Sequence, residues 1–181
     1  KTKSNYNILF LSRLLKNKGV YEAIETFKII KKSYENARLY ICGDGAEKEN
    51  VLQLINNQED VKFFGYIIGE KKEKIFNECN LFLYPSYEDG MPNAVLEAMA
   101  YGLVIVTRDV GGLSDFFIEG HHGYMTKSKS PKIFANFIIK LFKNEDLMKK
   151  ISANNRNYAA KNFMPDVVAK RLMGIVENIL W

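Results

Sequence analysis

The amino-acid sequence predicts an α/β fold: a Rossmann-like, doubly wound parallel sheet followed by C-terminal helices. Short apolar runs alternate along the chain with segments whose apolar residues recur at helical spacing, which is typical of parallel strands joined by helical crossovers. The runs are apolar throughout rather than alternating with polar residues, so we expect strands that are covered on both faces. A length of 181 residues suits one such domain with a sizeable core.

Six strands are expected, and most of them end at glycine or at a polar turn. They span residues 7–12, 38–42, 61–64, 81–84, 103–107 and 123–125. Strands of this kind are joined by crossovers that return to the same edge of the sheet, so their carboxyl ends all meet at one edge.

Helices are expected between the strands and after the last one. Apolar residues fall at helical spacing from Val20 to Tyr34, and shorter helices are expected over 51–55, 75–79 and 94–100, the last one stopped by Gly102. After residue 130, three apolar stripes at 133–142, 147–151 and 167–179 predict helices that pack on the sheet or on a partner. The final helix, Asp166 to Trp181, is expected to expose an apolar face when that partner is absent.

Composition excludes several classes of protein. No apolar run approaches the ~20 residues that span a bilayer, and no secretory signal is visible. Cys42 and Cys79 lack metal-ligand spacing and are expected to be reduced core residues of a cytoplasmic protein. His121 and His122 lie between two glycines, which suits a turn better than a metal site, so no metal is expected. The net charge of +5 reflects spread-out lysines, and no nucleic-acid-binding signature is present, so we expect no nucleic acid partner.

The segment from Tyr84 to Ala100 carries the most informative pattern. An apolar run ends there, an acidic turn follows with Gly90, and Pro92 stands near the first position of a helix, where a missing N–H does no harm. Strand, turn and helix together present free backbone N–H groups and the positive end of a helix dipole at the edge of the sheet. Asp89 and Glu97 flank that point. A nucleotide-sugar, with phosphate at one end and hydroxyls at the other, suits such a place; a turn that only caps a helix explains this segment equally well.

Further candidates follow the other strands, because ligands of open α/β sheets bind beyond the carboxyl ends of the strands. They are Arg13, Lys16, Lys18, Gly43, Asp44, Gly45, Gly65, Tyr66, Arg108, Asp109, Gly111 and Gly112. Arg13 and Lys18 offer two cations that could neutralise a diphosphate, with a solvated turn as the alternative.

Three other kinds of site fit the sequence poorly. Residues 43–48 have lysine where the third glycine of a dinucleotide-binding turn belongs, and no P-loop pattern exists. Asp89 and Glu97 would be ~12 Å apart along a helix, beyond the roughly 5–9.5 Å of a glycosidase acid pair.

Five segments together resemble the C-terminal domain of retaining GT-B glycosyltransferases of family 4, and the resemblance covers nearly the whole chain. Residues 11–19 (LSRLLKNKG) look like the family's GRLxxxKG segment, 40–45 (YICGDG) like its GxG turn, 61–66 (VKFFGY) like its VxFxG strand end, 89–102 (DGMPNAVLEAMAYG) like its EGxPxxxLEAMAxG signature, and 111–123 like its GGxxExxxxGxxG loop. The order and spacing of all five make the match specific.

The resemblance implies roles for individual residues. Arg13 and Lys18 would hold the donor diphosphate, Glu97 would bind the ribose hydroxyls, and Asp89 would meet the sugar ring. The implied donor site comprises Arg13, Lys18, Gly43, Tyr66, Ile68, Asp89, Gly90, Met91, Pro92, Asn93 and Glu97, with Asp89, Arg13 and Lys18 as the catalytic residues. Tyr66 and Ile68 would lie near the base, which the residues leave open among uracil, guanine and adenine and for which UDP is our expectation. Asp89 stands where the family usually has glutamate, one methylene longer, and Ser12 stands where it has glycine.

The resemblance therefore implies that residues 1–181 are a single donor-binding domain, one half of a GT-B fold, whose N-terminal acceptor domain is absent. The whole enzyme would move a sugar from a nucleotide-diphosphate sugar to an acceptor hydroxyl in polysaccharide or glycolipid synthesis, and this half alone would be inactive in transfer. No cofactor is expected. A cytoplasmic location, at the inner face of a membrane if the acceptor is lipid-linked, fits the basic composition. Two alternatives remain open: a non-catalytic nucleotide-sugar binding or scaffolding module, and a nucleotide-sugar epimerase of the same fold.

Overall fold

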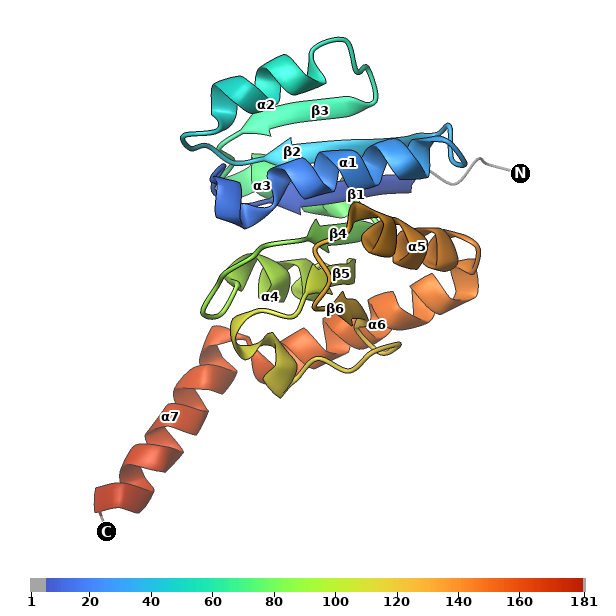
Figure 1. Cartoon of the computed structure of the whole chain (residues 1–181). Coiled ribbons are helices and arrows are strands. Elements are labelled where there is room, and N and C mark those ends of the chain that lie inside the picture. The colour runs from blue at the N-terminus through green and yellow to red at the C-terminus, as the bar shows by residue number, and fades with distance from the viewer. Residues whose placement is uncertain (1–5, 181) are drawn as a thin grey trace.

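The centre of the computed structural model, which describes residues 6–180, is a parallel six-stranded sheet in the order β3-β2-β1-β4-β5-β6 (Figure 1). The strands are β1 (Tyr6–Leu11), β2 (Ala37–Cys42), β3 (Val61–Gly65), β4 (Leu81–Tyr84), β5 (Val104–Arg108) and β6 (Gly123–Thr126). The predicted fold class is confirmed, and each strand boundary lies within one residue of its predicted position.

The strand order creates a switch point between β1 and β4. From β1 the chain moves outward to β2 and β3, then returns to place β4 on the other side of β1, with Ile8 opposite Leu81 in the register. In open α/β sheets, the crevice outside the carboxyl ends of the strands at such a point is where ligands bind. The fold therefore marks the loops that follow β1 and β4 as the place to look for a site.

Helices cover both faces of the sheet (Figure 1). They are α1 (Val20–Lys31), α2 (Lys48–Ile55), α3 (Gly69–Glu78), α4 (Asn93–Ala100), α5 (Pro131–Phe142), α6 (Glu145–Asn162) and α7 (Pro165–Leu180). The core on one face contains the apolar residues of α1, α2 and α5, and the core on the opposite face contains those of α3 and α4. Along β1, Ile8 and Phe10 belong to the first core and Leu9 to the second, all fully buried, which explains the uninterrupted apolar runs.

The first helix is shorter than its apolar spacing predicts. α1 ends at Lys31, and Tyr34 lies in the turn that leads to β2. The Tyr34 ring packs edge-on against Tyr6 at 5.0 Å and against Phe142 at 5.3 Å between ring centroids. Tyr34 packs against the same core as the apolar residues of α1. The apolar spacing in the sequence therefore continues past the end of the helix.

The cysteines and histidines occupy positions close to those predicted. Cys42 and Cys79 are free and buried in the core, and burial raises the pKa of the Cys42 thiol to about 12. His122 lies in a turn, as expected, but is buried there, and its Nδ1 is 2.8 Å from Oδ1 of Asn155 in α6. Within residues 6–180, no group of three or more His, Cys, Asp or Glu side chains could hold a metal ion.

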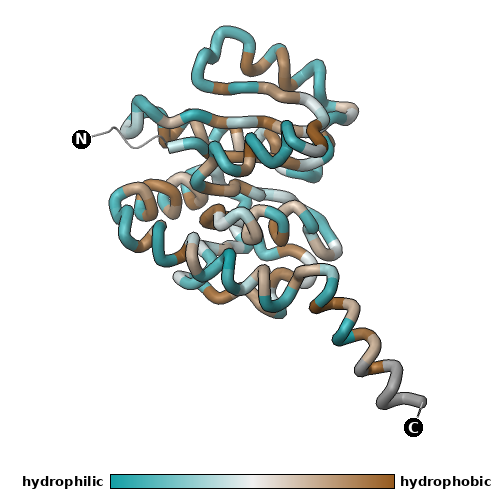
Figure 2. Tube along the Cα trace, turned by 180° about the vertical axis from the view of Figure 1, so that it is seen from behind, coloured by the Kyte–Doolittle hydropathy of each residue, from teal (hydrophilic) through white to brown (hydrophobic). Residues whose placement is uncertain are grey.

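The last helix projects away from the rest of the molecule (Figure 1). Val168, Leu172 and Ile175 follow one another at helical spacing, and all three are exposed, Leu172 to 58%. Figure 2 shows apolar residues along this helix where it leaves the body of the domain. The expectation of an exposed apolar face is confirmed for these side chains. Among the helices within residues 6–180, none is both long enough and apolar enough to span a membrane.

Candidate functional site

The loops that follow β1 and β4 touch at the carboxyl edge of the sheet. Gly19 adopts a left-handed conformation (φ 79°), and a Cβ atom there would lie 2.5 Å from the carbonyl oxygen of Pro85. Beside this contact, the backbone N–H of Tyr87 donates to the carbonyl oxygen of Asn17 at 2.8 Å. Because only glycine fits between the two backbones, Gly19 sets how closely the loops approach.

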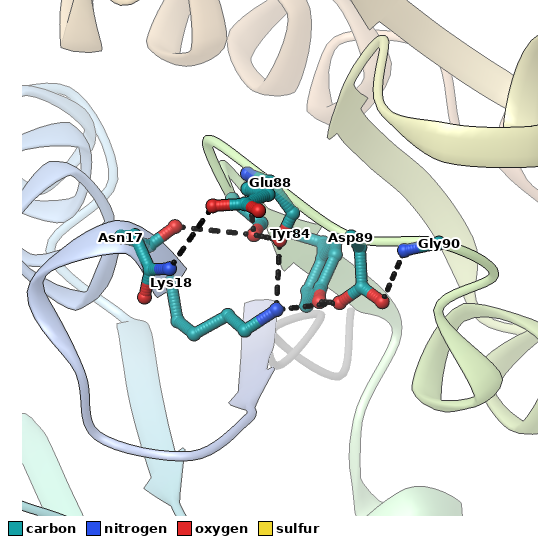
Figure 3. Close-up of polar contacts among 7 residues, drawn as sticks. Asn17, Lys18, Tyr84, Glu88, Asp89 and Gly90 are labelled. Atoms are coloured by element: carbon teal, nitrogen blue, oxygen red, sulfur yellow. Dashed lines mark hydrogen bonds and ion pairs between the residues drawn. The ribbon is translucent and has the colours of Figure 1, made fainter.

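This approach buries Lys18 against the acidic turn (Figure 3). The Lys18 ammonium donates to the carbonyl oxygen of Glu88 at 2.7 Å and to Oδ2 of Asp89 at 2.8 Å. The same Oδ2 accepts the hydroxyl of Tyr84, while Oδ1 of Asp89 accepts the N–H of Gly90 at 2.9 Å. The Lys18 side chain is only 9% exposed and that of Asp89 is 22% exposed. We call these residues, Lys18, Tyr84, Glu88, Asp89 and Gly90, the Lys18–Asp89 cluster.

The electrostatics of this cluster hold Asp89 in its ionised form. Burial favours the neutral acid, but the hydrogen bonds from Lys18 and Tyr84 outweigh burial and lower the pKa of Asp89 below its ordinary value. Burial and the hydrogen bond to Asp89 raise the pKa of Tyr84, so its phenol stays protonated and donates. A general acid must carry a proton, so the lowered pKa of Asp89 argues against a general-acid role for this residue.

A third loop, which follows β5, supports the acidic turn from the other side. The N–H of Gly112 donates to the carbonyl oxygen of Gly90 at 2.8 Å. Gly111 has a positive φ of 56°, and a Cβ atom there would lie 1.9 Å from the same oxygen. The paired glycines of the predicted GGxxExxxxGxxG loop thus fix the backbone directly after Asp89. Arg108, at the end of β5, instead stacks on the ring of Tyr87, 4.0 Å from its centroid.

A pocket of about 280 Å³ lies beside this cluster, at the ends of β1, β2 and β3. Its lining combines apolar side chains, backbone of a glycine turn and two cations: Leu11, Ser12, Arg13, Gly43, Asp44, Tyr66, Ile67, Ile68 and Lys72. Gly43 has a φ of 138°, and a Cβ atom there would lie 1.8 Å from the carbonyl oxygen of Ser12, so glycine is required where the first two loops meet.

The structure brings together four of the predicted donor residues in that pocket: Arg13, Gly43, Tyr66 and Ile68. Arg13 is exposed, and its guanidinium makes no hydrogen bond or ion pair with any other residue that the structure describes. Lys18 and Asp89, by contrast, do not line the pocket and are bonded to each other. The two predicted diphosphate cations therefore differ: one is open to solvent and unpaired, and the other is buried and paired.

Glu97 and the start of α4 complete the set of predicted residues. Pro92 directly precedes the first helical residue, Asn93, so it lies near the start of the helix as predicted, and Met91 and Asn93 are exposed. Glu97 lies on α4 and forms an ion pair with Lys72 of α3, at 2.7 Å. Lys72 connects Glu97 to the pocket, because its side chain also lines it.

Lys72 and Tyr84 are site residues that sequence reasoning did not find. Lys72 stands in the run EKKEK, where nothing distinguishes it from Lys71 and Lys74 as a solvated helical lysine. Tyr84 lies in a buried strand, as the sequence predicts, but its hydroxyl donates to a carboxylate in the following turn. A second pocket, of about 230 Å³, lies at the opposite edge of the sheet near Asn80, Gly102 and Arg156, and holds none of the predicted site residues.

The fold is that of a Rossmann-like α/β domain, and comparison with known proteins identifies its family. The chain belongs to the glycosyl transferases group 1 family, whose model matches residues 1–158. The structure has the Rossmann-like α/β fold that the sequence predicted.

Characterised relatives are glycosyltransferases. The capsular polysaccharide biosynthesis glycosyltransferase CapM of Staphylococcus aureus is 27% identical over 97% of this chain and 47% of its own length. The N,N'-diacetylbacillosaminyl-diphospho-undecaprenol alpha-1,3-N-acetylgalactosaminyltransferase of Campylobacter jejuni is 26% identical over 96% of this chain and 45% of its own length. The chain spans about half the length of these curated relatives.

Solved structures share the fold. HepE of Anabaena, in complex with UDP-glucose, superposes with a TM-score of 0.84 at 20% identity, over 97% of this chain and 49% of HepE. The C-terminal domain of the group 1 family protein LpcC from Francisella tularensis superposes with a TM-score of 0.77 at 20% identity, over 88% of this chain and 87% of that one. The second structure shows that a domain of this fold can be crystallised without the other half.

Replacing Gly19 with alanine is expected to destabilise the fold far more than the same change at Gly120. Both glycines have φ near +78°, at 79° and 76°, but a Cβ at Gly120 meets no atom within 4 Å. Gly120→Ala is therefore expected to lose about 1 kcal/mol, from backbone conformation alone, and Gly19→Ala about 3 kcal/mol, because the loops must separate. Urea unfolding measures both; equal losses would show that the loop contact is not a tight constraint.

Replacing Lys18 with methionine is expected to cost about 2 kcal/mol at pH 7, since it leaves Asp89 partly buried without its cation. A carboxylate with a lowered pKa stabilises the fold above its unfolded pKa, about 3.9, and this contribution is lost as the pH falls through the lower folded pKa. The difference in unfolding free energy between wild type and Lys18→Met should therefore shrink below about pH 4.

The control for this experiment is Lys28→Met, which removes the exposed Lys28–Glu25 pair (2.7 Å) and should cost less than about 1 kcal/mol. A loss for Lys18→Met that is no larger than the control, or that does not change with pH, contradicts the assigned ion pair.

Proposed function

We propose that the chain is the donor-binding half of a retaining glycosyltransferase, and that UDP is the nucleotide of the donor. The observation that carries the proposal is the continuous site at the switch point: an apolar-walled pocket with one unpaired cation, Arg13, next to the Lys18–Asp89 cluster and the start of α4. Pocket, cations and helix N-terminus follow one another as base, diphosphate and sugar do in a nucleotide-sugar.

The pocket suits the base and ribose. Tyr66 and Ile68 are exposed to 73% and 66%, and such exposed apolar surface beside a pocket is available to stack on a planar base. Their backbone follows Gly65 at the end of β3, and its N–H and C=O groups would pair with the edge of the base. Glu97, held at the wall of this pocket, supplies the acceptor for ribose hydroxyls that the resemblance to the family implies.

The diphosphate would lie between Arg13 and Lys18. Arg13 has its full set of donors available, and a guanidinium matches the geometry of phosphate oxygens. Lys18 uses two of its three ammonium donors on Glu88 and Asp89, which leaves one for a phosphate oxygen. The N-terminus of α4 adds partial positive charge. During transfer, the anomeric carbon exchanges its bond to the diphosphate oxygen for a bond to the acceptor oxygen, and the proton of the acceptor hydroxyl leaves with the diphosphate. These groups would stabilise the departing diphosphate.

Asp89 would face the sugar, as the resemblance implies, while bound to Lys18 and Tyr84. Its carboxylate already accepts three hydrogen bonds, two at Oδ2 and one at Oδ1, and a carboxylate can accept about four, so one position remains for a sugar hydroxyl. The pairing with Lys18 would link sugar recognition to diphosphate binding. The Lys18 ammonium holds Asp89, which would contact the sugar, and the same ammonium would contact the diphosphate. The other half of the enzyme would determine the acceptor and any location at a membrane surface. The relative from Campylobacter jejuni carries diphospho-undecaprenol in its name, which supports a lipid-linked acceptor.

Calorimetric titration of the 181-residue chain with UDP, GDP and ADP tests the proposal. Saturable binding of UDP is expected, weakened at least about tenfold by Arg13→Gln, because that change removes the unpaired cation. Raising the salt concentration should weaken binding as well.

The matched control is Arg38→Gln, which removes an exposed arginine at the start of β2, the opposite end of that strand from the site. If none of the three nucleotides binds, the donor-binding assignment is wrong. If GDP or ADP binds and UDP does not, the assignment of the base alone is wrong.

A further inference from the structure

Lys72 and Glu97 form an ion pair that bridges two helices at the wall of the pocket. Nζ of Lys72, from the first turns of α3, lies 2.7 Å from Oε2 and 2.8 Å from Oε1 of Glu97, on α4. The same ammonium lies 5.9 Å from the centroid of the Phe76 ring, one turn further along α3. Lys72 also lines the pocket, and Glu97, which is not among the lining residues, lies one ion pair away from that wall.

The hydrogen-bond capacity of this pair leaves room for a ligand. A carboxylate can accept about four hydrogen bonds, two at each oxygen, and Lys72 approaches both oxygens. One position therefore remains on each oxygen of Glu97. Two neighbouring hydroxyl groups, such as the 2′- and 3′-hydroxyls of a ribose, would fill them.

The charge of the pair also suits a nucleoside diphosphate. A lone carboxylate beside the pocket would repel the negatively charged diphosphate held near Arg13. The positive charge of Lys72 offsets the negative charge of Glu97. The site therefore keeps a carboxylate that can accept hydrogen bonds from hydroxyl groups, without net repulsion of the diphosphate. Asp44, the carboxylate that lines the pocket itself, is likewise paired, with Lys48 at 2.9 Å.

Both side chains of the pair are partly exposed, so the position of the Glu97 carboxylate depends on its contact with Lys72. The side chain of Glu97 is 42% exposed and that of Lys72 is 28% exposed. Without a cation beside it, a half-exposed glutamate side chain would adopt several rotamers that point into solvent. Holding it in one place before the ligand arrives lowers the entropy lost on binding.

We propose that Lys72 is a positioning residue of the donor site, which holds Glu97 so that its carboxylate recognises the ribose of the nucleoside diphosphate. This inference rests on the proposed function, because it assigns a part of the same site. It predicts that Lys72 controls discrimination between ribose and 2′-deoxyribose, which a residue that only stabilises the fold does not.

The test compares nucleotide pairs by calorimetry on the 181-residue chain. The probe is whichever of UDP, GDP and ADP the wild type binds most tightly, measured against its 2′-deoxy counterpart. The wild type is expected to favour the ribonucleotide about tenfold, the effect of one hydrogen bond to a charged acceptor. Lys72→Met should reduce that ratio to about threefold or less; the uncompensated charge of Glu97 should weaken the binding of both nucleotides, and that of the ribonucleotide more. Lys72→Arg, which keeps the cation, should preserve most of the ratio.

Lys74→Met is the control, since it removes the same charge from the same helix without touching Glu97, and should leave the ratio unchanged. An unaltered or larger ratio in Lys72→Met overturns the inference while leaving the proposed function intact. A wild type that binds none of the three nucleotides overturns both.

Discussion

The close approach of the loops after β1 and β4 is the constraint on which the rest of the site depends. Gly19 lets the first loop reach the Pro85 carbonyl, and this contact places Lys18 beneath the acidic turn. The sheet order makes the contact possible, because β1 and β4 are neighbours although 69 residues separate Leu11 from Leu81. Once the loops meet, the Lys18 ammonium, the Tyr84 hydroxyl and the Gly90 amide converge on one carboxylate, Asp89.

Two lysine–carboxylate pairs divide the work at this edge. The Lys18–Asp89 pair is largely buried, and removing charges from water is costly unless further hydrogen bonds compensate, as those from Tyr84 and Gly90 do here. The Lys72–Glu97 pair is half exposed and contributes little to stability by itself. The first pair therefore belongs to the architecture of the site as well as to its chemistry, whereas the second is explained best by what it would recognise.

Much of the fold could be predicted from the sequence because its strands are buried on both faces and therefore read as short, uninterrupted apolar runs. The glycines of the turns, such as Gly43 and Gly111, indicated where two backbone segments approach closely. The polar residues after each strand indicated the edge of the sheet at which the candidate site lies. Which lysine pairs with which carboxylate could not be predicted. Lys72 is one of three similar lysines on α3, and only the packing of α3 beside α4 brings it to Glu97. The sequence likewise offered Lys18 as a free cation, because its partner is fixed by a loop contact 71 residues away.

The central claim is that a nucleotide diphosphate binds where the ends of β1, β2, β3 and β4 meet. Amide hydrogen–deuterium exchange with and without saturating UDP tests it most directly. The account predicts slower exchange in the loops at residues 12–19, 43–45, 66–72 and 85–93, which form the pocket and the Lys18–Asp89 cluster. It predicts no change near Asn80, Gly102 and Arg156, which line the pocket at the opposite edge. Slower exchange confined to that opposite pocket would contradict the claim.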